Sequence, residues 1–214
     1  MVSKDIRCIA VEGVIGVGKT SLARLLADRL QGRLILEKHD DNPFLADFYK
    51  DPARYAFQTQ LFFLLSRFQQ QQEFRQLDVF HPVIISDYIF AKDRIFAFLN
   101  LSDRELQLYE QVYQTLGKDV PRPDLVIFLQ SSVPLLMQNI RRRSRSYEKH
   151  ITEEYIRSLV EAYNHFFFHY QESSLLVVNR SKLDFVNREA DLETLLTQID
   201  RHPGGVVFLN PDIT

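Results

Sequence analysis

Residues 13–20 read Gly-Val-Ile-Gly-Val-Gly-Lys-Thr, a G-x-x-x-x-G-K-T pattern that constrains the fold more than any other stretch of the chain. An apolar run precedes it at residues 6–11, and leucines at helical spacing follow it. In this context a buried strand ends, glycines let the backbone wrap an anion, and the N–H groups of a helix N-terminus point at phosphate. The pattern therefore predicts a loop that binds the phosphates of a nucleoside triphosphate.

Two side chains of this loop have distinct expected roles. Lys19 is placed to reach the β- and γ-phosphates, and the hydroxyl of Thr20 to bind Mg²⁺. The nucleotide-binding residues predicted from the pattern are Gly13, Val14, Ile15, Gly16, Val17, Gly18, Lys19, Thr20 and Ser21. The pattern leaves the phosphate acceptor undefined, so the rest of the chain must identify it.

Composition narrows the class of protein. With 214 residues, 45% hydrophobic and 25% charged, the chain suits one globular domain, expected at residues 1–202 with a tail at 203–214. The net charge of −2 argues against nucleic acid or an anionic membrane as a partner, and no apolar run is long enough to span a bilayer. The lone cysteine, Cys8, cannot form an internal disulfide, which fits a reducing, cytoplasmic setting.

Short apolar runs alternate with helical patterns along the chain. Five runs are expected to be strands, at residues 6–11, 34–36, 82–87, 124–129 and 175–178. Helices are expected at residues 44–77 (divided at Pro52), 91–99, 102–116, 133–143, 152–170 and 189–201. This alternation predicts an α/β protein with a five-stranded parallel sheet covered by helices on both faces. The apolar residues 206–209 of the tail could add to a sheet edge, reach a partner, or be disordered.

Chemistry-bearing residues follow three of the predicted strands. The phosphate loop follows the first, Glu37 the second and Asp87 the third. Because the carboxyl ends of parallel strands meet at one edge of a sheet, we expect these groups to lie together there.

Four arginines fall within residues 141–145, between a predicted helix and Glu148. Two other interpretations are a solvent-exposed basic face and a nucleic-acid-binding patch. The near-neutral net charge argues against the nucleic-acid-binding patch. An arginine lid that closes over transferring phosphate explains the cluster better, because developing charge needs donors that arrive with closure and exclude water. Arg143 and Arg145 could both face one phosphate if the segment between them is extended.

Residues 181–184 read Ser-Lys-Leu-Asp, close to the guanine-reading motif of GTPases and in about the right place. No Asp-x-x-Gly switch motif follows a predicted strand. A P-loop NTPase acting as a regulatory module is therefore less favoured than a small-molecule kinase.

From about residue 6 to residue 185 the chain resembles the deoxyribonucleoside kinase family, especially its bacterial deoxyadenosine/deoxyguanosine branch. Each motif alone is weak, but their order and spacing are specific. They are the phosphate loop, Glu37, Asp41-Asn42-Pro43-Phe44-Leu45, Tyr49 with Gln60, Ser66-Arg67, Asp87-Tyr88, Asp93-Arg94-Ile95-Phe96-Ala97, and Arg143-x-Arg145-x-x-Glu148.

The resemblance implies a role for each matching residue on the acceptor side. Glu37 is the general base that takes the proton from the nucleoside 5′-hydroxyl. Gln60 reads the base, since its amide offers a donor and an acceptor side by side. Arg67 and Asp93 complete base recognition.

Further roles concern the sugar and the donor nucleotide. The resemblance implies that Tyr49 and Glu148 contact the sugar 3′-hydroxyl, and a tyrosine packed there would crowd a 2′-hydroxyl. It also implies that Asp184 and Phe185 pack near the adenine of ATP.

The chain departs from the family pattern after the third strand. Many relatives carry Glu-Arg-Ser there, and that arginine touches phosphate, but this chain reads Asp87-Tyr88-Ile89. Asp87 can still serve Mg²⁺. Lys92 or Arg94 could replace the arginine, and we favour Lys92.

The sequence thus predicts a P-loop kinase fold and a kinase that transfers the γ-phosphate of ATP to the 5′-hydroxyl of a deoxynucleoside. Deoxyadenosine and deoxyguanosine are favoured, and deoxycytidine is possible. The catalytic residues expected are Glu37, Lys19, Arg143 and Arg145, with ATP and Mg²⁺ bound. The family implies a homodimer. The nearest alternative is a nucleoside monophosphate kinase of thymidylate-kinase type, for which Arg67 could bind the acceptor's phosphate.

Overall fold

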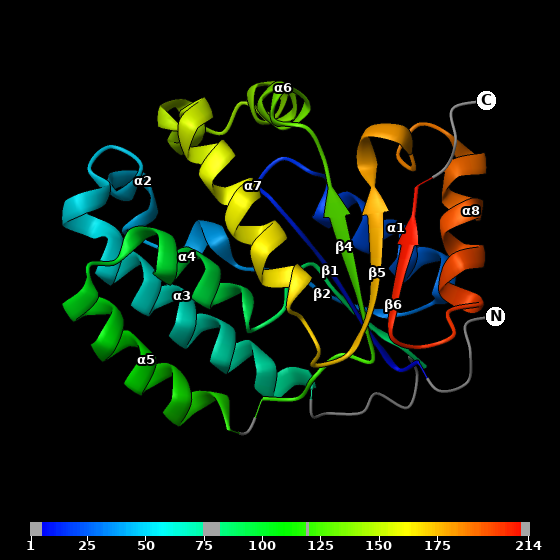
Figure 1. Ribbon diagram of the computed structural model, residues 1–214, viewed down its shortest axis with the longest axis horizontal. Helices are drawn as coiled ribbons and strands as arrows, with labels where there is room; N and C mark the ends of the chain where they lie inside the picture. Colours follow the sequence, from blue (N-terminus) through cyan, green and yellow to red (C-terminus); the bar gives the residue numbers. More distant parts are fainter. Residues whose placement is uncertain (1–5, 75–81, 119, 211–214) are drawn as a thin grey trace.

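A computed structural model of the protein describes residues 6–74, 82–118 and 120–210. Its strands form one sheet in which every pairing is parallel, in the order β2-β3-β1-β4-β5-β6 (Figure 1). The strands are β1 (Cys8–Gly13), β2 (Arg33–Ile35), β3 (Ile84–Ser86), β4 (Leu125–Gln130), β5 (Ser174–Asn179) and β6 (Val206–Leu209). The predicted parallel α/β fold is therefore confirmed.

The sheet has six strands where the sequence predicted five. The sixth, β6, comes from the predicted tail and pairs with β5, with Val206 opposite Leu175 and Leu209 opposite Val178. Of the three outcomes that the sequence left open for this apolar stretch, it adopts the first and extends the sheet edge. The limits of the domain itself stay a prediction.

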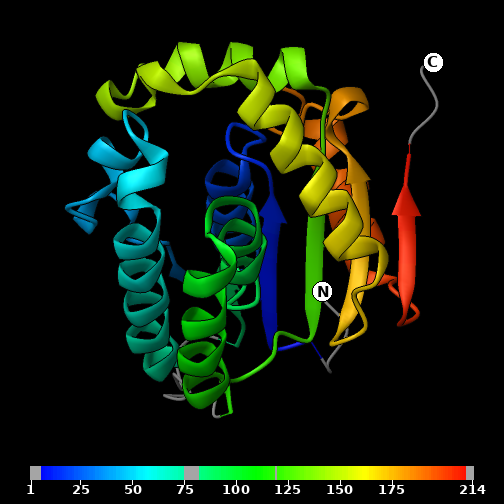
Figure 2. The ribbon, with the colours of Figure 1, turned by 60° about the vertical axis from the view of Figure 1, so that its left-hand side comes forward.

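Helices cover both faces of the sheet. Helices α1 and α8 lie on one face, α4 and α7 pack on the other, and α3 and α5 lie further out against α4 (Figures 1 and 2). The α-helices are α1 (Lys19–Leu30), α2 (Leu45–Phe48), α3 (Pro52–Phe74), α4 (Lys92–Asn100), α5 (Asp103–Gly117), α6 (Val133–Arg143), α7 (Glu153–Phe168) and α8 (Glu189–Asp200). Three 3₁₀ turns join them: η1 (His39–Asp41), η2 (Ser146–His150) and η3 (Arg180–Lys182).

Local sequence signals account for several helix ends. Pro52 divides the aromatic stretch as predicted, because it is the first residue of α3 and its fixed φ suits that position. The predicted end of this stretch near Leu77 lies outside the described residues. Ser102 and Glu105 form a capping box at the start of α5, within the helix predicted at residues 102–116.

The central strands carry the core. Residues of β1, β4 and β5 such as Ile9, Ile127 and Leu176 are fully buried between the two helical layers. Strands of a sheet that is buried on both faces have continuous apolar sequences, which explains why these strands could be predicted from the sequence. Within the described ranges, no helix combines the length and hydropathy that a membrane span requires.

Candidate active site

The phosphate loop joins β1 to α1 at the carboxyl edge of the sheet. Gly13, at φ 148°, lies so close to β4 that a Cβ there would be 2.5 Å from the carbonyl oxygen of Leu129. At Gly16, with φ 85°, a Cβ would be 2.8 Å from the carbonyl oxygen of Leu136 in α6. Both positions therefore require glycine on two grounds, backbone conformation and close approach.

Lys19 lies folded over its own loop. Its Nζ donates to the carbonyl oxygens of Gly13 at 2.7 Å and Val14 at 3.3 Å. Burial lowers the pKa of Lys19 to about 8, and the nearby positive charge of Lys92 lowers it further, against the opposing effect of three carboxylates. An anion bound in the loop would stabilise the charged form of this lysine.

Thr20 and Asp87 meet where β3 ends beside the loop. The Thr20 hydroxyl donates to Asp87 Oδ2 at 2.5 Å, and the backbone N–H of Glu37 donates to Asp87 Oδ1 at 2.8 Å. A hydroxyl and a carboxylate are the hard oxygen ligands that Mg²⁺ prefers, so these two residues fit the predicted metal. The described residues contain no group of three or more His, Cys, Asp or Glu side chains that could hold a metal, so phosphate oxygens and water would have to complete its coordination.

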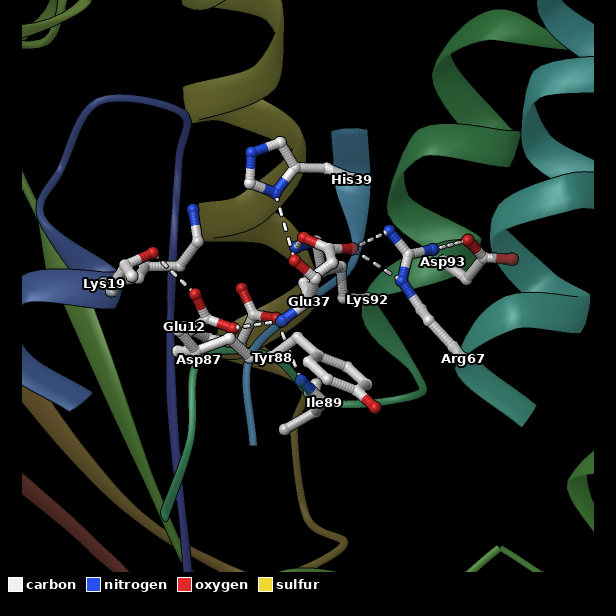
Figure 3. A network of polar contacts seen from close by, with 12 residues as sticks. Glu12, Lys19, Glu37, His39, Arg67, Asp87, Tyr88, Ile89, Lys92 and Asp93 are labelled. Atoms are coloured by element: carbon white, nitrogen blue, oxygen red, sulfur yellow. Dashed lines mark hydrogen bonds and ion pairs between the residues drawn. The ribbon is translucent and has the colours of Figure 1, made fainter. Parts of the chain in front are cut away.

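Glu37 lies at the centre of a buried charge network (Figure 3). Lys92 Nζ donates to its Oε2 at 2.7 Å, and Arg67 Nε donates to its Oε1 at 2.8 Å. Arg67 also forms an ion pair with Asp93, whose other oxygen accepts a 2.7 Å hydrogen bond from the Tyr109 hydroxyl. The four charged side chains come from α3, α4 and the segment after β2, which only the fold brings together.

The charges around Glu37 decide its protonation state. Burial by itself would raise the pKa of this carboxyl, but the positive charges of Arg67 and Lys92, with their hydrogen bonds, hold the pKa below its ordinary value. Glu37 is therefore ionised at neutral pH and able to accept a proton.

One cavity extends from the phosphate loop to the middle of α3. The predicted residues that line it are Ile15, Lys19, Thr20, Glu37, Tyr49, Gln60, Arg67, Asp87, Lys92, Arg143, Arg145 and Glu148. Gln60 is buried, and its Oε1 has no hydrogen-bond partner among the described residues. A buried amide oxygen without a partner is costly in isolation, which marks Gln60 as a group available to a ligand. Asp93 does not line this cavity, because it lies behind Arg67.

A second cavity lies on the other side of the phosphate loop. Its lining includes residues 16–21 with Asn139, Arg142, Arg143, Arg180 and Val186. The predicted Asp184 and Phe185 are neighbours of this cavity rather than part of its lining. The guanidinium of Arg180 stacks on the Phe185 ring at 4.7 Å, and its Nη2 donates to Asp184 at 3.2 Å.

The arginine segment after α6 is bent. Ser144, at φ 50°, ends α6 in the left-handed conformation, and Arg145 is extended. Arg143 binds Glu148 through two hydrogen bonds, one of them from Nε to Oε2 at 2.7 Å, and Arg145 Nη1 lies 3.9 Å from Oε1 of the same carboxylate. The two guanidiniums thus face one anionic group, but the residue between them is in the left-handed conformation and not in the extended one that the sequence analysis considered.

Sequence reasoning missed several residues at this site. Glu12 is fully buried and accepts hydrogen bonds from the backbone N–H groups of Gly13 at 2.9 Å and Ile89 at 3.0 Å. The signal was an acidic residue at the end of an otherwise apolar strand. Arg180 and Tyr147 carry no such signal, because only the fold places them at the cavities.

A family model described as deoxynucleoside kinase matches residues 9–202. The chain belongs to the deoxynucleoside kinase family. The kinase is similar to deoxyguanosine kinase of Bacillus subtilis (strain 168), with 34% identity over 197 residues that cover 89% of this chain and 95% of that protein. It is also similar to deoxyadenosine kinase of Dictyostelium discoideum, with 40% identity over 165 residues, 74% of this chain and 65% of that protein.

Solved structures agree with this assignment. The structure of deoxyadenosine kinase from M. mycoides with bound dATP has a TM-score of 0.79 to this kinase at 25% identity, covering 90% of this chain and 98% of that one. The P-loop kinase fold predicted from the sequence is thereby confirmed, and so is the predicted family. The kinase is an enzyme that phosphorylates deoxynucleosides with ATP.

Proposed function

We propose that this kinase transfers the γ-phosphate of ATP to the 5′-hydroxyl of a purine deoxynucleoside, deoxyadenosine or deoxyguanosine, with deoxycytidine as a weaker acceptor. The observation that carries the proposal is the position of Glu37, which lines the same cavity as Lys19 of the phosphate loop and Gln60 of α3. A nucleoside whose base reaches Gln60 has its sugar next to Glu37 and its 5′-hydroxyl toward the phosphate loop.

Glu37 acts as the general base in this proposal. Its carboxylate accepts the proton of the 5′-hydroxyl as that oxygen attacks phosphorus. Lys92 holds Oε2 of the same carboxylate and lines the cavity, and we assign to it the phosphate contact of the arginine that Tyr88 replaces. Lys92 therefore supplies positive charge both to the base and to the transferring phosphate.

The donor side consists of the phosphate loop, the metal ligands and the lid. Lys19 binds the β- and γ-phosphates, while Arg143 and Arg145 stabilise the charge that develops on the transferring group. Thr20 and Asp87 would hold Mg²⁺, which would neutralise phosphate charge and orient the triphosphate. Phe185 and Asp184 support the adenine through their contacts with Arg180.

The nucleoside side consists of base and sugar contacts. Gln60 hydrogen-bonds the base edge through the oxygen that has no partner among the described residues. Arg67, held by Glu37 and Asp93, is the second polar group at the base. Tyr49 and Glu148 contact the 3′-hydroxyl, and Tyr49 disfavours a 2′-hydroxyl.

The proposal extends to the assembly and setting of the kinase. A homodimer follows from the family resemblance, with the long helices α3 and α5 as the interface. Leu65 of α3 and Leu108 of α5 are large apolar residues that this chain leaves 43% and 51% exposed. A cytoplasmic location fits the single cysteine. Light scattering on the purified kinase tests the dimer, and a mass of one 25.2 kDa chain contradicts it.

A phosphate-transfer panel tests the function. The four deoxynucleosides, adenosine, dTMP and a blank without acceptor are each incubated with ATP and Mg²⁺. We expect the highest kcat/KM with a purine deoxynucleoside and far lower values with adenosine. Preferred turnover of dTMP would instead indicate a monophosphate kinase, and hydrolysis in the blank at comparable rates an NTPase.

A substitution of Gln60 tests the base contact within the same panel. Gln60→Leu should lower kcat/KM for the preferred base by about tenfold to a hundredfold, because the edge of the base loses its partner. Gln58→Leu is the matched control, since Gln58 lies on the same helix and is exposed. Equal effects of the two substitutions on kcat/KM would contradict a contact between Gln60 and the base.

A further inference from the structure

Tyr147 joins the lid to the nucleoside side of the cavity. It lies in η2, directly after the lid arginines, and its hydroxyl donates to Asp40 Oδ1 at 2.7 Å. Asp40 belongs to η1, which follows Glu37 after β2. A hydrogen bond to a carboxylate is stronger than one between neutral groups, and this one lowers the pKa of Asp40 below its ordinary value.

The ring of Tyr147 makes a second attachment. It stacks on the ring of Tyr49, with centroids 6.3 Å apart and planes 4° apart. Tyr49 is itself held edge-on by Tyr155 at 6.4 Å and contacts Phe48 at 5.2 Å. The guanidinium of Arg145 lies 5.9 Å from the centre of the Tyr147 ring. Tyr147 thus contacts three groups simultaneously: Tyr49, which is the proposed sugar contact, Asp40 of η1, and the lid residue Arg145.

The position of Tyr147 has a consequence for its neighbour. Glu148 is buried, lines the cavity and holds both Arg143 and Arg145. Because η2 is a short 3₁₀ turn, the two attachments of Tyr147 also determine where Glu148 and its arginines lie. The lid arginines are therefore tied to the two segments that carry Glu37 and Tyr49.

We propose that Tyr147 is a positioning residue that latches the lid to the nucleoside side of the cavity through Asp40 and Tyr49. A deoxynucleoside whose sugar packs on Tyr49 then orders the stack, and with it the arginines that face the transferring phosphate. The latch makes closure over ATP depend on an occupied sugar site. This role rests on the proposed function, but the latch itself does not require turnover.

The first test measures the latch directly, without substrate. Trypsin cleaves after the exposed arginines of residues 141–145 when the segment opens, so the cleavage rate reports the population of the open lid. Tyr147→Phe and Asp40→Ala should each raise that rate by about three- to tenfold, as expected for one hydrogen bond to a charged group at a partly exposed site. The double variant should be no faster than either single variant, because both remove the same contact.

Two further variants are controls for this measurement. Asp40→Asn keeps an acceptor oxygen and should retain most of the protection. Tyr170→Phe removes a tyrosine hydroxyl that forms a 2.7 Å hydrogen bond with Ser173 outside both cavities, and should leave cleavage unchanged. Unchanged cleavage in Tyr147→Phe, or additive effects in the double variant, would overturn the latch. Thermal melts confirm that each variant is folded.

The second test measures coupling to the substrate. In the wild type, a deoxynucleoside should slow cleavage of residues 141–145, and in Tyr147→Phe this protection should largely disappear. The kcat/KM for the deoxynucleoside should fall by about three- to tenfold in Tyr147→Phe, and it should be recovered in Asp40→Asn but not in Asp40→Ala. Equal nucleoside protection in the wild type and Tyr147→Phe would overturn the coupling. If no deoxynucleoside is phosphorylated by the wild type, the proposed function fails, while the cleavage rates still decide the latch.

Discussion

Glu37, the proposed general base, is held by residues that oppose this chemistry. Arg67 and Lys92 keep its carboxylate ionised inside the protein, and for the same reason they weaken it as a proton acceptor. In the proposed function Lys92 also contacts the transferring phosphate, and any weakening of its bond to Glu37 would raise the pKa of that carboxyl. A cation such as Lys92, which contacts the base Glu37 and in the proposed function also the transferring phosphate, could thereby link proton transfer to phosphate transfer.

The first prediction concerns Glu37→Gln. Removing the carboxylate should lower kcat by about a hundredfold or more, because the 5′-hydroxyl loses its proton acceptor, while the KM for the deoxynucleoside changes little. Steady-state kinetics measure both constants. Turnover near the wild-type level would transfer the role of base to another group, with Asp87 the next candidate. A melting curve is needed beside the kinetics, since Arg67 and Lys92 lose a buried partner.

The second prediction concerns pH and Lys19. Because the pKa of Lys19 is lowered to about 8, this lysine is charged at neutral pH and loses its proton as the pH rises above 8. ATP binds the charged form, so affinity should be flat below pH 8 and should weaken by up to about tenfold per pH unit above it.

Calorimetry between pH 7 and pH 9.5 measures this affinity and the accompanying proton uptake. The groups that face Lys19 are Lys92, Glu12, Glu37 and Asp87. Lys19→Arg stays charged throughout and should bind ATP without this pH dependence. Affinity for ATP that does not change up to pH 9.5 in the wild type would show that Lys19 does not titrate in this range.

At the scale of elements, the site depends on contacts between loops that are far apart in the sequence. Glu12 links the phosphate loop to the segment after β3 by accepting from Gly13 and Ile89, and Tyr163 of α7 lies within 3.4 Å of the same carboxylate. This segment also carries Asp87 and leads into α4 with Lys92. One buried carboxylate therefore holds the phosphate loop against the segment between β3 and α4.

The third prediction follows from that contact. Glu12→Gln should lower the free energy of unfolding by about 1–3 kcal/mol, because an amide has one acceptor oxygen for the two backbone N–H groups. Urea denaturation measures the change. Glu161→Gln is the matched control at an exposed position of α7, and should stay within about 0.5 kcal/mol of the wild type. Equal stability of the two variants would contradict a structural role for Glu12.

The fourth prediction concerns the lid element. Arg145→Ala should lower kcat by about a hundredfold if this arginine stabilises transferring charge, since one such donor contributes that much in comparable sites. Kinetics with saturating ATP separate this effect from binding. A rise in the KM for ATP with unchanged kcat would assign Arg145 to ground-state binding instead.

At the scale of the whole molecule, the two cavities and the edge strand β6 lie in different parts of the sheet. The cavities lie at the carboxyl ends of the strands around β1, and β6 lies at the far edge beside β5. Leu209 of β6 is buried, whereas Phe208 is 72% exposed (Figure 2 shows β6 at the edge). The edge strand therefore contributes to the core through one face only.

The fifth prediction uses this separation. A chain that ends at His202 loses the ladder to β5 and the burial of Leu209, and should be less stable by about 2 kcal/mol or more. Its kcat with saturating substrates, measured well below the melting temperature, should stay within about twofold of the wild type, because β6 supplies no residue to either cavity. A folded truncated chain with little activity would instead place residues 203–214 at the site.

Some features of this kinase were determined by the sequence alone. The phosphate loop, the strand ends at Glu37 and Asp87, and the division of a helix at Pro52 were predictable, because each depends on neighbouring residues and the period of a buried element. The family resemblance added Gln60, Arg67 and Glu148, which line the cavity, while their contacts with a nucleoside stay a prediction.

Only the tertiary structure decided which charges meet. Asp93 lies behind Arg67 instead of lining the cavity, Lys92 reaches Glu37 across 55 residues, and the hydroxyl of Tyr147 reaches Asp40 across 107. The sixth strand was likewise decided by an open edge on β5 that the sequence pattern does not reveal. Ion pairs and hydrogen bonds act over a few ångströms, so the packing of distant elements, and not local spacing, selects their partners.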